Sequence, residues 1–346
     1  MKKILSMAAL ALMVASCSND DENVKIDNGE ASNAVAIQIS QKVAGVESKA
    51  AITPGSKMQA TIIMVDAGAS DANNPDFSAF IPKKENTLDE SNNLNSEENR
   101  ATVATTQFEA STSAAAIELN PKLYYPVEGS NSTKKTFLFG VSPMGAVSGT
   151  SVEFTPTDGS LDVMYAEKVD AGSKSSHDAK PELTFKHKTT QLTFVAKLSE
   201  ELTGSDWDGQ KVTVKNIVIQ NAKVPASLNF STGTVTWTAG ADLTVAGCNT
   251  ELTTTACKPS VPVMVQPTSG IKVNLELSVD GNIKWYNNLT IQNSSSTGDL
   301  TTKEAESHEI TFTITPPKTA ADGTAIDATA KIVDWTVGEK GNVEIK

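Results

Sequence analysis

The chain has 346 residues, and its 41 acidic residues outnumber its 29 lysines and arginines, giving a formal net charge of −12. A surface of this sign repels nucleic acid, so the composition excludes a nucleic-acid partner. Aromatic residues make up only 5% of the chain, and no cluster of them resembles the stacking platform of a sugar-binding site.

The N-terminus predicts export. Residues 1–16 contain Lys2 and Lys3, then an apolar run, then two small residues directly before Cys17. The apolar run is well short of the ~20 residues that a membrane-spanning helix needs, so it is typical of a cleaved signal peptide. Removing these two lysines takes the formal charge from −12 to −14.

The cleavage region also predicts a lipid anchor. The segment Val14-Ala15-Ser16-Cys17 looks like a bacterial lipobox, in which Cys17 is acylated and becomes the first residue of the mature chain. Acyl chains contribute roughly 0.8 kcal/mol per buried methylene, so two or more anchor a protein stably. Ordinary cleavage that leaves a free Cys17 is the alternative. The acidic run at 18–22 resembles a surface-export signal, so we expect 17–33 to be a lipidated tether on the outer face of the outer membrane.

From residue 35 onward the dominant pattern is alternation with period two, which predicts β-strands with one buried face. The clearest strand has its apolar side chains at Ile271, Val273, Leu275, Leu277 and Val279. Asp280-Gly281 then predicts a tight turn, because glycine accepts a positive φ, and residues 283–291 return as a partner strand.

Many short strands separated by turn residues favour an all-β protein built from β-sandwiches. Strands are predicted at residues 35–40, 60–66, 117–125, 135–143, 161–166, 183–198, 211–220, 227–237, 261–266, 310–315 and 331–337. The polar, acidic stretch 83–100 breaks the pattern and is expected to be an exposed insertion, either a loop or a short helix.

About 330 mature residues exceed one comfortable hydrophobic core, so two domains are expected. The segment 170–181 is rich in glycine, serine, lysine and aspartate, and apolar alternation resumes at Leu183. We therefore expect one β-sandwich domain over residues 34–180 and a second over residues 181–346.

The sequence carries no recognisable catalytic or metal-binding motif, so we expect no enzyme, no cofactor and no metal. Its three histidines, His177, His187 and His308, lack metal-ligand spacing. His187 follows Leu183 and Phe185 at strand period, which predicts a hydrogen-bonded histidine on a half-buried face. The oxygen-rich segments 71–76 and 206–209 lack a full calcium-ligand ladder and are expected to be turns.

Two cysteines remain after Cys17 is assigned to lipid. Cys248 and Cys257 are close in sequence, and an exported protein meets an oxidising environment, so they could form a disulfide. Such a bridge would stabilise the fold by roughly 2–3 kcal/mol on the loop-entropy account. The alternative is two unpaired, partly buried thiols.

With these features in place, the chain resembles the fimbrillin family of the Bacteroidetes, whose members are two-domain, transthyretin-like β-sandwich pilins. Besides the lipobox and acidic tail, the resemblance rests on the order of four segments: VAIQI at 35–39, LDVMYA at 161–166, LTFKHK at 183–188 and IVDWTVG at 332–338. It implies a fimbrial subunit that supports adhesion and whose partners are its own copies or related subunits.

The resemblance also implies how such a subunit assembles. A surface protease removes the first strand of the N-terminal domain, and a strand from the next subunit fills the opened groove. Here the removable strand would contain Val35, Ile37 and Ile39, whose burial contributes on the order of 5 kcal/mol. The cut would fall at Lys49-Ala50, where the family usually has an arginine.

The lysine at position 49 leaves two hypotheses open. A lysine-tolerant protease would release the first strand and allow polymerisation. An unprocessed chain would instead be a non-polymerising surface lipoprotein, either a fimbrial anchor or a binder of host glycan or protein.

Overall fold

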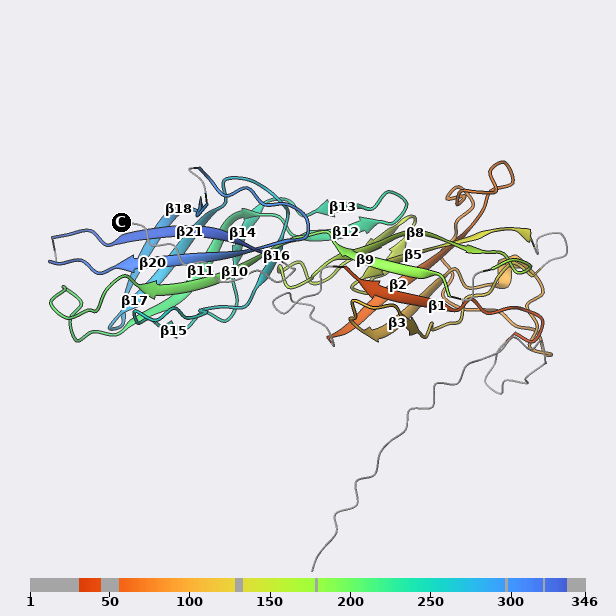
Figure 1. Cartoon of the computed structure of the whole chain (residues 1–346), viewed down its shortest axis with the longest axis horizontal. Coiled ribbons are helices and arrows are strands. Elements are labelled where there is room, and N and C mark those ends of the chain that lie inside the picture. Colours follow the sequence, from red (N-terminus) through yellow and green to blue (C-terminus); the bar gives the residue numbers. More distant parts are fainter. Residues whose placement is uncertain are drawn as a thin grey trace, which may run out of the picture.

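The computed structural model describes residues 31–44, 56–127, 133–177, 180–295, 298–319 and 321–334. In these residues the chain is almost entirely β, with one short 3-10 helix, η1 (Glu97–Asn99), so the all-β prediction is confirmed. The molecule is elongated, with the N-terminal and C-terminal strands gathered at opposite ends (Figure 1). None of the helices in the described part of the chain has the length and apolar content needed to traverse a bilayer.

The N-terminal half is built on a seven-stranded sheet. In spatial order its strands are β3 (Val103–Glu109), β2 (Lys57–Asp66), β5 (Thr136–Ser142), β8 (Met164–Gly172), β9 (Glu182–His187), β1 (Ile39–Val43) and β4 (Ala115–Ile117). The sheet curls until its two edges approach, because Thr105 in β3 exchanges backbone hydrogen bonds of 2.7 and 2.9 Å with Asn120, shortly after β4. The curled sheet encloses one apolar cluster that includes Ile62, Leu138 and Phe185.

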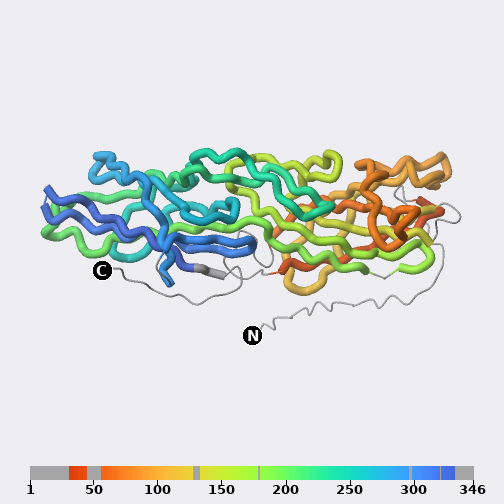
Figure 2. The backbone as a smooth tube through the Cα atoms, turned by 90° about the horizontal axis from the view of Figure 1, so that it is seen from above, coloured from red at the N-terminus to blue at the C-terminus, as the bar shows by residue number. Residues whose placement is uncertain are grey.

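A small four-stranded sheet covers the other face of the seven-stranded sheet. Its order is β13 (Thr234–Trp237), β12 (Pro225–Asn229), β7 (Ser151–Glu153) and β6 (Ala146–Ser148). The β12–β13 hairpin comes from the second half of the sequence and reaches across to pair with β7 of the first half (Figure 2). Its Leu228 and Phe230 are fully buried against Phe139 and Tyr165, so the hairpin fastens the two halves to each other.

The C-terminal half is a β-sandwich. One sheet has the order β16 (Val263–Val265), β10 (Thr190–Leu198), β20 (Glu306–Thr315), β21 (Ala325–Asp334) and β19 (Gln292–Asn293). The other has the order β14 (Ala241–Thr244), β11 (Val212–Ala222), β17 (Lys272–Val279) and β18 (Asn282–Thr290), and β15 (Thr250–Glu251) also pairs with β11. Their inner faces form a single apolar cluster, in which Phe194 and Phe312 stack with ring centroids 6.1 Å apart.

The predicted hairpin around Asp280-Gly281 is confirmed. The strands β17 and β18 pair antiparallel, and both turn residues have a positive φ, 47° at Asp280 and 88° at Gly281. The inward faces of β17 are also as predicted, since Val273, Leu275 and Leu277 are fully buried.

The pairing of the strands does not follow the expected boundary at 180/181. Strand β9 lies after that boundary but pairs with β8 and β1 of the N-terminal sheet. The single strand predicted at 183–198 is therefore two strands, β9 and β10, that belong to different sheets and meet at residues 188–189. Alternation continues through both strands, so the change of sheet leaves little trace in the pattern.

Two other predictions need correction. Residues 117–125 are only briefly β, at the end of β4 and at two isolated bridges, Asn120 with Thr105 and Tyr124 with Ala36. The stretch 83–100 is not wholly exposed, because Leu94 and Arg100 are buried, although it does contain the short helix η1.

Candidate functional site

The first strand lies in a slot in the N-terminal sheet. The term slot is used here for the space between β9 on one side and residues 111–125 on the other. Residues 35–44, the first strand, fill this space. Strand β1 runs parallel to β9 and antiparallel to β4, and β1 and β9 lie side by side in Figure 1. The first strand is therefore paired on both of its edges, unlike a strand that closes the end of a sheet.

Backbone hydrogen bonds hold the first strand along its whole length. On one wall, the Ile37 amide donates to the Leu123 carbonyl at an N–O distance of 2.8 Å, and the Tyr125 amide donates to the Val35 carbonyl at 3.1 Å. On the other wall, Ser40 donates to Pro181 at 3.0 Å and Ala44 to Phe185 at 2.8 Å. Removing the strand would leave β9 as an unpaired edge and residues 111–125 without their main backbone partners.

The inward face of the strand is buried in the N-terminal core. Ile37 and Ile39 are fully buried, and Val35 is half-buried against the same cluster, as the alternation predicts. Burying side chains of this kind contributes on the order of 1.5–3 kcal/mol each. The strand is thus held by side-chain burial as well as by backbone pairing.

Residues just before the strand are fastened by the insertion at 83–100. Ser32 donates its amide to Asn92 at 2.8 Å, and the Asn33 side chain bonds both backbone groups of Leu94, at 2.8 and 3.0 Å. Ala31, Leu94 and Tyr124 form a small apolar cluster beneath this contact. This contact could not be predicted from the sequence, because a polar, acidic stretch gives no sign of what it contacts.

Several residues of the predicted processing route lie outside the described residues: Cys17, Lys49, Ala50 and the end of the chain from residue 335. Acylation at Cys17 and cleavage at Lys49-Ala50 therefore stay predictions. The three residues assigned to the removable strand, Val35, Ile37 and Ile39, are all described and all lie in the slot.

Arg100 is the chain's single arginine, and it is buried at the base of the insertion. Its side chain is 2% exposed. The guanidinium forms an ion pair with Asp66 and donates a hydrogen bond of 2.7 Å to the carbonyl of Tyr124. Tyr124 in turn bridges to Ala36, so the arginine supports the wall of the slot next to the first strand.

We therefore expect an arginine-specific protease to leave the folded chain uncut after Arg100, because cleavage needs an extended, accessible segment. The same protease should cut the urea-unfolded chain once, after residue 100. Mass spectrometry of both digests checks this, and cleavage of the native chain at residue 100 would show that the buried ion pair does not protect the segment.

His187 and the oxygen-rich loop at 71–76 have the local structure that the sequence predicts, a hydrogen-bonded histidine and a turn. His187 is buried and bonds the carboxylate of Asp162 at 2.9 Å. In the loop 71–76, the Asp71 carboxylate accepts hydrogen bonds from Asn73 and Asn74, which lower the pKa of Asp71 and define a turn. Among the described residues, no group of three or more acidic, histidine or cysteine side chains is arranged to hold a metal ion.

Cys248 and Cys257 are free thiols in the structure, which corresponds to the second of the two alternatives. Both side chains are half-buried against the C-terminal core, and each thiol lies near a backbone carbonyl, Val245 at 3.5 Å and Ala196 at 3.3 Å. Burial raises the pKa of both thiols. A disulfide between them stays a prediction for the exported protein.

Labelling of the two thiols tests directly whether the disulfide between Cys248 and Cys257 forms. In reduced, folded protein near neutral pH we expect slow labelling by a thiol reagent, because burial and a raised pKa both suppress the reactive thiolate. Unfolding should make labelling fast at both positions. Protein isolated from the oxidising compartment that takes up no label even when unfolded would instead contain the bridge.

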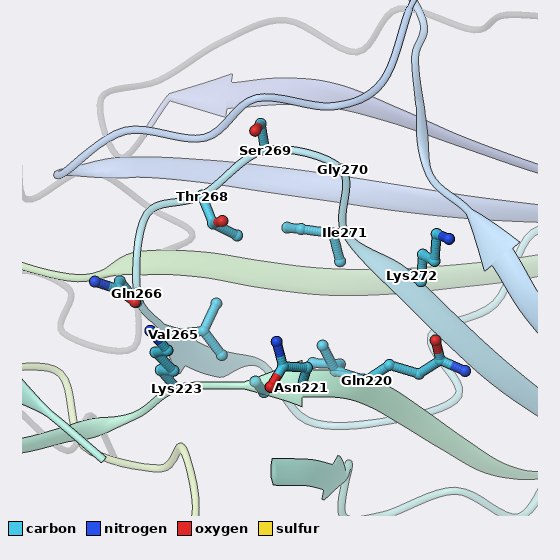
Figure 3. A pocket seen from close by; sticks show the side chains of 12 residues that line it. Gln220, Asn221, Lys223, Val265, Gln266, Thr268, Ser269, Gly270, Ile271 and Lys272 are labelled. Carbon is cyan, nitrogen blue, oxygen red and sulfur yellow. The ribbon is translucent and has the colours of Figure 1, made fainter. Parts of the chain in front are cut away.

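A hollow of about 300 Å³ lies at one end of the C-terminal sandwich. Figure 3 shows its lining, which comes from the end of β11, the start of β17 and the loop between β16 and β17. The lining side chains are aliphatic, amide, hydroxyl and lysine groups, with no carboxylate, imidazole or thiol among them. This hollow therefore offers no acid–base pair and lies in the other half of the chain from the slot.

The sequence was compared with known protein families, curated proteins and solved structures. The sequence matches the profile of the Fimbrillin-like family over residues 65–335. The chain therefore belongs to the Fimbrillin-like family, and the resemblance predicted from its sequence is confirmed. No match was found among curated protein sequences.

The solved structures to which this chain is similar are remote from it in sequence. A candidate cell adhesion protein from Bacteroides uniformis is 16% identical, with 86% of this chain and 99% of that chain covered and a TM-score of 0.47. The fimbrial anchor protein Mfa2 from Porphyromonas gingivalis is 9% identical, with 88% and 99% covered and a TM-score of 0.37. The family assignment rests on the profile match and not on these structures.

Proposed function

We propose that this protein is a structural subunit of a cell-surface fimbria, not an enzyme. It is exported as a lipoprotein through Cys17, loses its first strand to a surface protease that cuts near Lys49-Ala50, and assembles by strand exchange with its own copies or related subunits. The assembled fimbria supports adhesion. The observation that carries the proposal is the first strand itself, a short N-terminal segment paired on both edges inside an otherwise complete sheet.

The physics of the slot supports this function. Without the first strand, two rows of backbone groups and an apolar floor face solvent, and such an edge recruits another strand. An incoming strand regains ladder hydrogen bonds on both walls, so backbone pairing supplies affinity and the alternate side chains supply specificity. The interface would therefore reuse contacts that the folded monomer already makes.

The buried state of Arg100 allows a clean experiment. In the variant Lys49→Arg the new arginine lies at the proposed processing site, while the native arginine is shielded. An arginine-specific protease should then cut the folded chain after residue 49 alone, and the wild-type chain serves as the uncut control. Size-exclusion chromatography with light scattering follows the product.

We expect the cut variant to lose its N-terminal segment and to grow into oligomers, while uncut wild-type protein stays monomeric. A cut chain that remains a monomer with the segment in place contradicts polymerisation. That result would favour the alternative of a non-polymerising surface lipoprotein, either a fimbrial anchor or a binder of host glycan or protein, to which the lysine at position 49 also points.

A further inference from the structure

The apolar face of the first strand contains one polar residue. Its inward side chains alternate as Val35, Ile37, Ile39, Gln41 and Val43. Gln41 is 0% exposed, so it is as deeply buried as its apolar neighbours. In the ladder it stands opposite Leu183 on one wall and Ala115 on the other, neither of which offers a polar side chain.

The amide of Gln41 is only half satisfied. Its Nε2 donates a hydrogen bond of 3.3 Å to the carbonyl of Glu109, at the end of β3. Its Oε1 has no hydrogen-bond partner among the residues that the structure describes. A buried acceptor that loses water without gaining a partner lowers the equilibrium constant for its burial by about tenfold or more.

We propose that Gln41 weakens the binding of the first strand in the slot. An incoming strand with an apolar side chain at the same position can then displace it. The inference rests on the proposed strand exchange and specifies which incoming strand that exchange favours. The partner is an extended segment of another subunit with apolar side chains at all five alternate positions. Such a segment keeps every favourable contact of the first strand and removes the unsatisfied oxygen.

The position of Gln41 suits this role. It lies near the end of the strand that faces the proposed cut, with Val43 the last inward residue before residues 45–55. The more N-terminal part, from residue 32 to Ile39, is held by the insertion and by fully buried isoleucines. Fraying after the cut would therefore begin at the weakly held end and proceed toward the strongly held end.

Methionine provides the direct comparison, because it has nearly the length and volume of glutamine without its polar groups. In the full mature chain we expect Gln41→Met to raise the equilibrium constant for folding by about tenfold, measured by urea unfolding. Gln38→Met is the matched control, since Gln38 is on the same strand but exposed, and it should change stability little. If Gln41→Met lowered stability, the bond to Glu109 would be a net stabilising contact and the inference would be wrong.

The kinetics of release then separate this inference from the proposed function. In the Lys49→Arg background, cut at residue 49 and labelled at the N-terminus, the departure of the first strand is followed by loss of the label from the large fragment. We expect Gln41→Met to slow departure by about tenfold and Gln38→Met to leave it unchanged. Equal departure rates for Gln41→Met and the parent would overturn the inference. A gain in stability with no departure from any cut variant would support the weak contact at Gln41 but contradict strand exchange.

Discussion

Replacing Arg100 with methionine is expected to lower the free energy of unfolding by about 3 kcal/mol, because it removes the buried partner of Asp66 and leaves that carboxylate with the more distant Lys134, 3.9 Å away. The guanidinium reaches both Asp66 and the carbonyl of Tyr124, so its loss removes a charge and a hydrogen-bond donor together. Methionine keeps much of the aliphatic volume, which limits the contribution of a cavity. Urea unfolding of the full mature chain measures the change.

Lys134→Met is the matched control for that prediction. Lys134 lies 3.9 Å from the same carboxylate of Asp66 and 2.9 Å from Glu97, but its side chain is 31% exposed. Solvent-exposed pairs contribute about 0–1 kcal/mol, so the control should be nearly neutral. If the two variants lost similar stability, the burial of Arg100 would not be the reason why its ion pair stabilises the fold.

Replacing Phe230 with alanine should cost about 3–5 kcal/mol, as large-to-small changes of aromatic core residues do. Phe230 is fully buried and lies among the rings of Phe77, Phe80 and Phe139, with centroids 5.3–6.1 Å away. It follows β12, so the substitution also removes the main anchor of the hairpin that crosses between the halves. We therefore expect hydrogen exchange to quicken locally in β7, the strand with which β12 pairs.

Phe312→Ala provides the comparison for the hairpin. Phe312 is equally buried but lies in the C-terminal sandwich, stacked on Phe194. It should destabilise the protein by a similar amount and leave local exchange in β7 unchanged. If both variants quickened exchange in β7 equally, the hairpin would not be a specific fastening between the halves.

The sequence predicts those parts of the fold whose signals are local. The hairpin at 271–291 follows from period-two alternation and a turn pair that accepts positive φ, and the burial of Ile37 and Ile39 follows from alternation alone. The crossing of β12 and β13 to the N-terminal half does not, because long-range strand pairing has no local signature. For the same reason, the assignment of β9 to the N-terminal sheet could not be seen from the run at 183–198.

The slot was predictable in part. The apolar face of the first strand was recognised up to Ile39, and continuing the same period by two residues would have placed Gln41 on the buried face. The second wall was predicted only as a strand at 117–125, and its pairing with the first strand was not, because this wall consists of β4 and isolated bridges at Asn120 and Tyr124. The burial of Arg100 was also hidden, since a single arginine in an acidic stretch ordinarily lies at the surface.

The central claim is that the first strand can leave the slot and that another strand takes its place. Hydrogen exchange of the two walls, β9 and residues 111–125, tests this most directly in the Lys49→Arg chain before cutting, after cutting and after assembly. We predict that the backbone amides of the walls lose protection once the strand departs and regain it in the oligomer. Protection that stays unchanged through all three states would contradict the claim.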